Sequence, residues 1–323
     1  TSKLALIALF APLLAPGCSG PSSLTAKDPQ SVASVGPIRQ PPLAAPKDLI
    51  LPVIGKSSLD NGLRVWVLPD HSLPLVSVNL HLQAGTLDAP LDRMGLATFT
   101  AMMLRQGVQG MDADTLSETV DMAGASLSAS AHGERTIISC WARKEHTELC
   151  LKLVAALALR PTFPANEMKE VRDKLLGGVK QRRDDPGSLA AMHFNNQLYG
   201  DNHPEGAAMS AASLARITRE DLLAFHKQLF VPGDALLGVS GDVEPDMAKA
   251  LAHKYFGPWA KGHRPPRRIP AAQDPPEGLR VLLVDKPDLT QASFTLGHAG
   301  LARVHKDRDV VEVLNHVLGG GGF

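Results

Sequence analysis

Histidine and cysteine are the side chains of this chain that are best suited to bind a metal ion. The 323 residues include 12 histidines and three cysteines. No two histidines lie three or four positions apart, the spacing that places two imidazoles on one face of a helix. Cys140 and Cys150 lack partners at zinc-finger spacing, and we interpret them as small buried hydrophobic residues, with a disulfide as the alternative. These residues therefore predict no metal site, unless one is assembled from distant parts of the chain.

Two other patterns that could support chemistry are better explained as turns. Asp184 and Asp185 form a pair of carboxylates, but they follow a helical pattern and precede Pro186, as expected where a helix ends and the chain turns. The glycine run at 319–322 lacks the Lys-Ser/Thr pair that completes a phosphate-binding loop. We therefore expect neither a catalytic pair of acids nor a nucleotide site.

Three single histidines remain as candidates. His226 lies on a predicted helix whose apolar face includes Leu222 and Phe225. A lone imidazole in such a place is more often a solvated or core-edge residue than a ligand. We interpret His226 in this way, and His298 and His316 likewise.

The overall charge and hydrophobicity exclude two classes of protein. Lys and Arg number 33 and so do Asp and Glu, so the formal net charge is zero and no chain-wide basic field exists to bind nucleic acid. Hydrophobic residues make up 44% of the chain, but the only long apolar stretch, 4–16, is shorter than the roughly 20 residues that a membrane-spanning helix needs. The sequence therefore predicts a folded protein of about two domains, with no nucleic-acid partner and no spanning helix.

The N-terminal residues are typical of a bacterial lipoprotein signal. Lys3 precedes the apolar run 4–14, and small residues follow up to Cys18. This arrangement is similar to the lipobox, in which the mature chain begins at a diacylated cysteine. An ordinary cleaved signal with an incidental cysteine is the alternative. Because residues 19–49 are rich in Pro, Ser and Ala, as a flexible tether is, we expect a lipoprotein signal at 1–18 and lipidation of Cys18.

Strand and helix patterns share the folded part of the chain. Residues 62–68 and 75–82 alternate apolar with polar side chains, as half-buried strands do. Helical spacing follows at 92–105, and the capping box Thr115–Glu118 predicts the start of a second helix. The mixture predicts an α+β fold. Further strands are expected at 125–131, 135–142 and 235–243, and further helices at 145–159, 166–183, 187–198, 218–230 and 245–255.

The beginning of this pattern recurs later in the chain. The sequence Gly-Leu-Arg-Val at 62–65 returns at 278–281, and in both places a strand, a proline-marked gap, a second strand and a helical run follow. The stretch 261–277 is rich in Pro and Arg and separates the two copies as a linker would. We therefore predict a first domain at 50–260, a linker at 261–277, and a second, truncated domain at 278–323.

Five motifs follow one another in a distinctive order. They are Gly95-Leu-Ala-x-Phe-x-x-x-Met-Leu-x-x-Gly107, Gly124-Ala-Ser-Leu127, Leu159-Arg-Pro-Thr-Phe163, Asp185-Pro186, and Phe225-His-Lys-Gln-Leu-Phe-Val-Pro232 leading to Val239-Ser-Gly-Asp242. Their order and spacing resemble those of the pitrilysin/insulinase family of metallopeptidases. The resemblance covers the chain from about residue 55 onward. It implies repeated α+β domains that pair to form a chamber around unfolded peptides, in agreement with the internal repeat.

The resemblance also implies a zinc motif, which this chain lacks. Active members carry His-x-x-Glu-His on the first helix, where two imidazoles hold Zn²⁺ and the glutamate takes a proton from the bound water, and a further glutamate ligand lies downstream. Aligned through Gly95, these positions hold Thr98, Ala101 and Met102, and Gly178 occupies the downstream position. A hydroxyl is a poor zinc ligand, a methyl group is no base, and a thioether suits softer metals. We therefore expect no catalytic residue and no bound zinc, the cofactor of the family.

The resemblance implies a working arrangement as well. Many bacterial and mitochondrial members work as pairs in which one chain bears the zinc, while the zinc-free chain supplies chamber wall and peptide-binding surface. We therefore predict the zinc-free subunit of a heterodimeric metallopeptidase, with a zinc-bearing homologous subunit and peptide or unfolded polypeptide as partners. An arginine and a tyrosine that the family's second domain contributes would lie beyond Phe323. A non-enzymatic scaffold that holds peptides is the first alternative, and a zinc peptidase that is active alone is the second.

The predicted anchor gives an expected location. A lipid on Cys18 would hold the chain on the periplasmic side of a bacterial cell envelope. Ser19, in place of an aspartate, follows the cysteine, and by analogy with lipoprotein sorting this favours the outer membrane.

Overall fold

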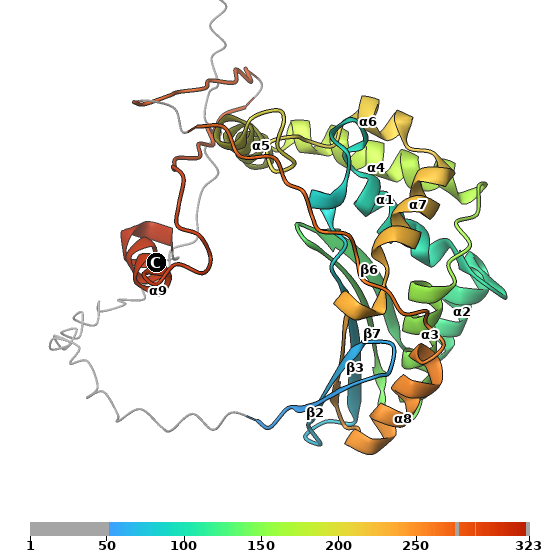
Figure 1. The fold of residues 1–323 in the computed structure, drawn as a ribbon. Coiled ribbons are helices and arrows are strands. Elements are labelled where there is room, and N and C mark those ends of the chain that lie inside the picture. The colour runs from blue at the N-terminus through green and yellow to red at the C-terminus, as the bar shows by residue number, and fades with distance from the viewer. Residues whose placement is uncertain (1–51, 275–277, 288, 321–323) are drawn as a thin grey trace, which may run out of the picture. The chain divides into compact units, whose positions relative to one another are not determined.

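The computed structural model describes residues 52–274, 278–287 and 289–320 (Figure 1). The predicted signal at 1–18, the tether at 19–49 and the lipidation site Cys18 lie outside these described residues. Within the described ranges, the structure contains no helix that is both long enough and apolar enough to cross a membrane.

The described part of the chain contains two β-sheets. Their strands are β1 Gly55–Ser58, β2 Arg64–Pro69, β3 Leu75–Leu82, β4 Gly107–Val108, β5 Met111–Asp112, β6 Ser126–His132, β7 Arg135–Arg143 and β8 Leu236–Gly241. The main sheet has six of these strands, in the order β1-β2-β8-β3-β7-β6. β2 and β8 are parallel, and the other neighbouring pairs are antiparallel. β4 and β5 form a separate antiparallel ribbon.

The central strand β3 shows why the main sheet has one buried and one polar face. Val78 and Leu80 have no exposed surface, whereas Ser77 and Asn79 point to the opposite side and are half-buried. This alternation was predicted from the sequence, because successive side chains of a strand point to opposite faces. On the polar face, Ser139 of β7 lies opposite Asn79 and donates a hydrogen bond of 2.7 Å to its Oδ1 atom.

The helices of the described residues confirm the predicted α+β class. Several of them lie on one side of the main sheet (Figure 1). Their bounds are α1 Leu96–Met103, α2 Ala113–Met122, α3 Thr147–Leu159, α4 Glu167–Asp184, α5 Pro186–Tyr199, α6 Ala211–Arg216, α7 Arg219–Leu229, α8 Pro245–Phe256 and α9 Arg308–Asn315.

Side-chain caps lie at the starts of four described helices, α2, α5, α6 and α7. Asp185 follows the last residue of α4 and caps α5, which confirms the predicted turn between two helices. Thr218 caps α7, also as predicted. The predicted start of α2 at the capping box Thr115–Glu118 is wrong, because Asp112 accepts a hydrogen bond of 2.9 Å from the Thr115 N–H. An aspartate is as good an N-cap as a threonine, so the earlier residue begins the helix.

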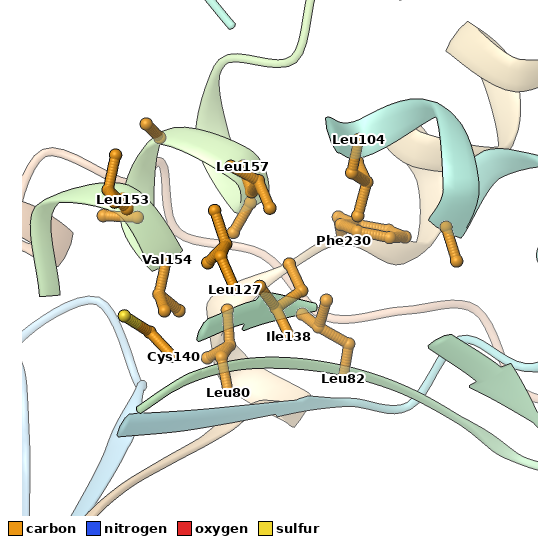
Figure 2. Close-up of a cluster of buried hydrophobic side chains, with 14 of the residues drawn as sticks. Leu80, Leu82, Leu104, Leu127, Ile138, Cys140, Leu153, Val154, Leu157 and Phe230 are labelled. Carbon is orange, nitrogen blue, oxygen red and sulfur yellow. The ribbon is translucent and has the colours of Figure 1, made fainter. Parts of the chain in front are cut away.

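Helix α3 covers the buried face of the main sheet (Figure 2). Val154 and Leu157 of this helix pack in the same cluster as Leu80 of β3 and Ile138 of β7, and none of the four has exposed surface. Burial of each such side chain contributes about 1.5–3 kcal/mol to stability. The layer of α3 on the sheet therefore forms part of the hydrophobic core.

The predicted repeat of the first strands is not observed in the described residues. Residues 278–287 and 289–307 form no strand, while the predicted helical run is found as α9. A strand requires a hydrogen-bonded neighbour, and these residues have none within the described ranges. The division into domains at 50–260 and 278–323, joined by a linker at 261–277, stays a prediction.

Candidate functional site

Helix α1 carries three of the four positions that the sequence analysis assigned to the zinc motif, Thr98, Ala101 and Met102. The chain enters it through Gly95, whose φ of 105° favours glycine. A Cβ atom at this position would lie 2.7 Å from the sulfur of Met209, so the glycine also permits a close approach of the segment before α6. Ser213 of α6 donates a hydrogen bond of 2.7 Å to the Met94 carbonyl. The start of α1 is therefore held in place by α6 and the segment before it.

The face of α1 that corresponds to the zinc motif is packed against other elements. Ala101, at the position predicted for the catalytic glutamate, is 1% exposed. Thr98 and Met102 are half-buried, and Met102 packs against the hydrophobic core. The helix contacts β6, α4 and α7. The position that would have to hold a proton-accepting carboxylate is therefore filled by a buried methyl group.

The fourth position, Gly178, lies on α4. This helix packs against α1, where the Arg172 guanidinium lies 5.3 Å from the centre of the Phe99 ring. Arg172 also donates hydrogen bonds to the carbonyls of Leu214 and Ile217, which join α4 to α6 and the turn that follows it. Gly178 itself is exposed, and a Cβ atom there would meet no other atom within 4 Å. The structure thus brings the two helices together, but it provides no side chain at the downstream ligand position.

The residues present do not fit a zinc ion. The donor set of the four positions consists of one hydroxyl and one thioether, and neither group is a good ligand for Zn²⁺. Elsewhere in the described ranges, His, Cys, Asp and Glu side chains form no group of three or more that could hold a metal. The four positions therefore support no metal-dependent step.

Strand β6 forms the edge of the main sheet beside α1 (Figure 1). Among the described strands it pairs only with β7, from Ser126 opposite Trp141 to His132 opposite Arg135. An edge strand presents backbone N–H and C=O groups that can pair with an added strand. Ser126 and Ser128 are exposed on this strand, and Leu127 between them is buried. The edge can therefore accept an extended polypeptide next to the packed face of α1.

The three single histidines lie at the edge of the core or at the surface. The His226 ring is half-buried beside Phe163 and Phe230, and its Nε2 atom lies 2.8 Å from the Ala158 carbonyl. Burial lowers the pKa of His226, which favours the neutral ring. His298 and His316 are exposed. None of the three has the surroundings of a metal ligand within the described residues.

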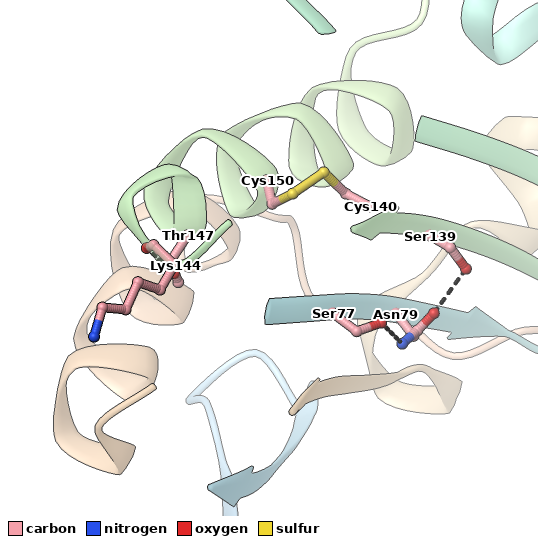
Figure 3. Close-up of a disulfide and its surroundings, with 7 residues drawn as sticks. All are labelled: Ser77, Asn79, Ser139, Cys140, Lys144, Thr147 and Cys150. Carbon is pink, nitrogen blue, oxygen red and sulfur yellow. Dashed lines mark hydrogen bonds between the residues drawn. A yellow bond between two sulfur atoms is a disulfide. The ribbon is translucent and has the colours of Figure 1, made fainter. Parts of the chain in front are cut away.

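The interpretation of the two central cysteines as separate hydrophobic residues is wrong. Cys140 and Cys150 form a disulfide, with their Cα atoms 5.4 Å apart (Figure 3). Cys140 lies on the buried face of β7, and a short turn at Lys144 leads the chain into α3, which folds back over that face. Thr147 donates a hydrogen bond of 2.6 Å to the Lys144 carbonyl in this turn. The reversal of the chain from β7 into α3 brings the two Cα atoms within the range that a disulfide requires.

Two charged clusters were missed by the sequence analysis. Asp242, after β8, accepts hydrogen bonds of 2.7 Å from Lys144 and from His71, and together they hold one end of the main sheet. The hydrogen bond from Lys144, followed by that from His71, lowers the pKa of Asp242. The second cluster centres on Asp88, which binds two arginines of the predicted linker. The excess of arginine over acid in that linker was the available sequence signal.

Two family models match parts of this chain. The model described as Insulinase (Peptidase family M16) matches residues 64–211, and the model described as Peptidase M16 inactive domain matches residues 216–323. An uncharacterised zinc protease of Mycobacterium leprae is 28% identical over 274 residues, which are 82% of this chain and 60% of that protein. The chain therefore spans about 60% of the length of this relative.

Solved structures agree with the family models. A crystal structure of a peptidase M16 inactive domain from Pseudomonas fluorescens is similar with a TM-score of 0.62 and 27% identity, covering 69% of this chain and 54% of that one. The first half of the periplasmic protease PqqL from Escherichia coli shares the fold, with a TM-score of 0.61 and 18% identity, over 68% of this chain and 49% of that one. The predicted resemblance is confirmed, and the chain belongs to the pitrilysin/insulinase-like M16 family.

Proposed function

We propose that this chain is the zinc-free subunit of a two-chain peptidase of the bacterial cell envelope, in which it binds peptide for a zinc-bearing homologous subunit. The observation that carries the proposal is the burial of Ala101 at the position of the catalytic glutamate. Thr98, Met102 and Gly178 replace the three metal ligands. A chain of this family that keeps the fold but lacks every group needed for hydrolysis retains binding as its contribution.

Peptide binding is supported by the edge strand β6. Its outer backbone groups can add an extended peptide by main-chain hydrogen bonds, without regard to most of the peptide's side chains. This mode suits a substrate that is unfolded and variable in sequence. The edge lies beside α1, so a peptide bound here would pass the face where active members hold zinc.

The comparisons support the inactive role. The similar Pseudomonas fluorescens structure is described as an inactive domain, and one of the two matching family models carries the same description. The Mycobacterium leprae relative is named a zinc protease, and that name applies to the relative. The residue types at the four positions separate the present chain from an active peptidase.

A periplasmic location is supported by two features. The Cys140–Cys150 disulfide suits an oxidising compartment, because disulfides are rare in the reducing cytosol of most bacteria. The Escherichia coli neighbour is described as periplasmic. We extend this proposal to a lipid anchor on Cys18 and to the outer membrane, which the sequence of residues 1–19 favours.

Affinity purification of the full chain from the cells that produce it tests the pairing. We expect a homologous protein with an intact His-x-x-Glu-His helix to co-purify, and the mixture to hydrolyse an unfolded polypeptide in a chelator-sensitive way. If the chain is recovered alone and still binds unfolded polypeptide, the result would favour a scaffold that works without a catalytic partner. Recovery of the chain alone without such binding would contradict the proposal.

The role of β6 is tested by proline substitution in that strand. Successive N–H groups of a strand point to opposite sides, so of Ser128 and Ala129 one directs its N–H toward β7 and the other toward the free edge. We therefore make both Ser128→Pro and Ala129→Pro. Proline at the inward position removes a hydrogen bond to β7 and lowers the Tm, so the variant that keeps the wild-type Tm carries its proline at the outward position. We expect this variant to bind a fluorescent unfolded polypeptide roughly tenfold more weakly, because proline removes one donor from the edge. Unchanged affinity in the folded variant would exclude strand addition at β6.

A further inference from the structure

Asp88 is a buried carboxylate that holds two arginines from a distant part of the chain. The Arg264 Nη2 atom lies 2.8 Å from Oδ1 of Asp88. Arg267 binds through two atoms, Nε to Oδ1 and Nη2 to Oδ2, each at 2.8 Å. The exposed fractions of the side chains are 5% for Asp88, 8% for Arg264 and 14% for Arg267. The three groups are therefore shielded from solvent, unlike an ordinary surface ion pair.

The same carboxylate belongs to the segment that leads into α1. Asp88 ends the short 3₁₀ turn Thr86–Asp88, and its Oδ2 atom accepts a hydrogen bond of 2.9 Å from the Gly85 N–H. A second 3₁₀ turn, Leu91–Arg93, then leads to Gly95 at the start of the helix. We call residues 84–93 the lead-in. One side chain thus closes a turn of the lead-in and binds the arginines of the linker.

The arginines lie in residues 261–270, which we call the strap. Its first residues attach through the backbone. The Gly233 N–H donates a hydrogen bond of 3.0 Å to the Gly262 carbonyl, and the Arg264 N–H donates one of 2.8 Å to the Asp234 carboxylate. A cavity of about 460 Å³ lies between the rest of the strap, the lead-in and α7, with Phe225 among the lining residues. Across this cavity, the side-chain hydrogen bonds of Arg264 and Arg267 attach the strap to the lead-in and its neighbours.

The charges around Asp88 are balanced within the chain. Two guanidinium groups face one carboxylate, and the excess positive charge is met by Glu134, whose Oε1 atom lies 3.2 Å from Nη1 of Arg267. The Gln83 carbonyl accepts from Arg264, and the Glu134 carbonyl accepts from Arg267. Removal of Asp88 leaves two shielded guanidinium groups without their shared carboxylate, which is more destabilising than loss of an exposed pair.

We propose that Asp88 acts as a two-way clamp, through which attachment of the strap fixes the conformation of the lead-in to α1. When the strap is attached, its arginines hold the Asp88 carboxylate where it closes the turn at Gly85. When the strap detaches, the carboxylate loses these contacts, and the turn and the start of α1 loosen together. This coupling does not depend on the proposed function, because it concerns only contacts within the chain.

Hydrogen exchange of the full chain tests the clamp, with a change in the strap and a readout in the lead-in. Arg267→Gln removes the two-point contact, and Arg268→Gln is the matched control because Arg268 is an exposed neighbour in the same strap. We expect Arg267→Gln to raise amide exchange roughly tenfold in both the strap and the lead-in, and Arg268→Gln to change neither. Faster exchange confined to the strap, or equal effects of the two variants, would overturn the proposal.

The substitution Asp88→Asn changes the other partner of the Asp88–Arg267 contact. If both residues act through one clamp, the double variant Asp88→Asn/Arg267→Gln should exchange no faster in the lead-in than the more affected single variant. If the increase in the exchange rate of the double variant equals the product of the two single increases, the two changes act independently, which would contradict the clamp. If Asp88→Asn does not fold, the comparison of Arg267→Gln with Arg268→Gln decides the question alone.

Discussion

Thr98 and Met102 stand four positions apart on α1, at the spacing of the two imidazoles in a zinc motif, and both are half-buried. Between them, the methyl group of Ala101 is almost fully buried. This face of α1 is therefore buried at Ala101 and half-buried at Thr98 and Met102. A protein can keep this arrangement without paired charges, because no ionised group has to be desolvated there.

Ala101→Glu is expected to destabilise the fold by about 1–3 kcal/mol, because a lone carboxylate would be buried without a metal ion to bind it. Urea unfolding measures this change. Ala250→Glu, at an exposed position of α8, serves as the control and should leave the unfolding midpoint close to that of the wild type. Equal midpoints for the two variants would mean that the α1 face opens to water.

The Cys140–Cys150 disulfide is expected to stabilise the fold by about 2–4 kcal/mol, through its constraint on the unfolded chain. Urea unfolding of the oxidised protein with and without a reductant measures this contribution. The variant Cys140→Ala/Cys150→Ala should be less stable than the oxidised wild type and should not respond to reductant. If alkylation of the unfolded, unreduced protein labels Cys140 and Cys150, the disulfide is absent in solution.

The Asp88 clamp gives the stability a defined pH dependence. Burial alone would raise the pKa of Asp88, but the hydrogen bonds from Arg267 and from the Gly85 N–H outweigh it, so this pKa lies below its ordinary value of 3.8. A carboxyl with a lowered pKa in the folded state stabilises the fold above its unfolded pKa, and this contribution is lost as the pH falls through the folded pKa.

Unfolding midpoints at about pH 6 and about pH 3 measure this dependence. We expect Asp88→Asn to lower stability most at the higher pH and thereby to reduce the difference between the two conditions. Asp92→Asn, at an exposed carboxyl of the lead-in, should leave the difference unchanged. If the unfolding midpoints of the Asp88→Asn variant differ between the two pH values as much as those of the wild type, Asp88 contributes no pH-dependent stability.

Cys18→Ser is expected to move the protein from the membrane fraction to the soluble periplasmic fraction, because it removes the predicted lipid anchor. Fractionation followed by immunoblotting measures the change. Ser19→Asp is the matched variant, which should keep the chain on a membrane but shift it from the outer to the inner one. Membrane association that persists in Cys18→Ser would assign the anchoring to a protein partner.

Local patterns made much of the fold predictable. The alternation of β3 gave its buried face, and the cap residue Thr218 gave the start of α7, because both depend on neighbouring residues alone. The start of α2 was missed because Asp112 and Thr115 are both good caps, and the sequence does not rank them. The family followed from short motifs.

Contacts between distant residues were not predictable in the same way. The bond between Cys140 and Cys150 depends on the reversal of α3 over β7, which neither residue type indicates. The Asp88–Arg267 contact joins residues separated by 179 positions, and only the folded chain brings them together. The strands expected near residue 278 require neighbouring strands to pair with, and the described residues provide none for them.

The most direct test of the central claim is the zinc content and the peptidase activity of the chain purified alone, after equilibration with Zn²⁺ and removal of the excess. The account predicts no stoichiometric zinc and no hydrolysis of an unfolded polypeptide above the background, because Thr98, Ala101, Met102 and Gly178 provide neither the ligands nor the base. One zinc ion per chain, together with hydrolysis that a chelator abolishes, would contradict it.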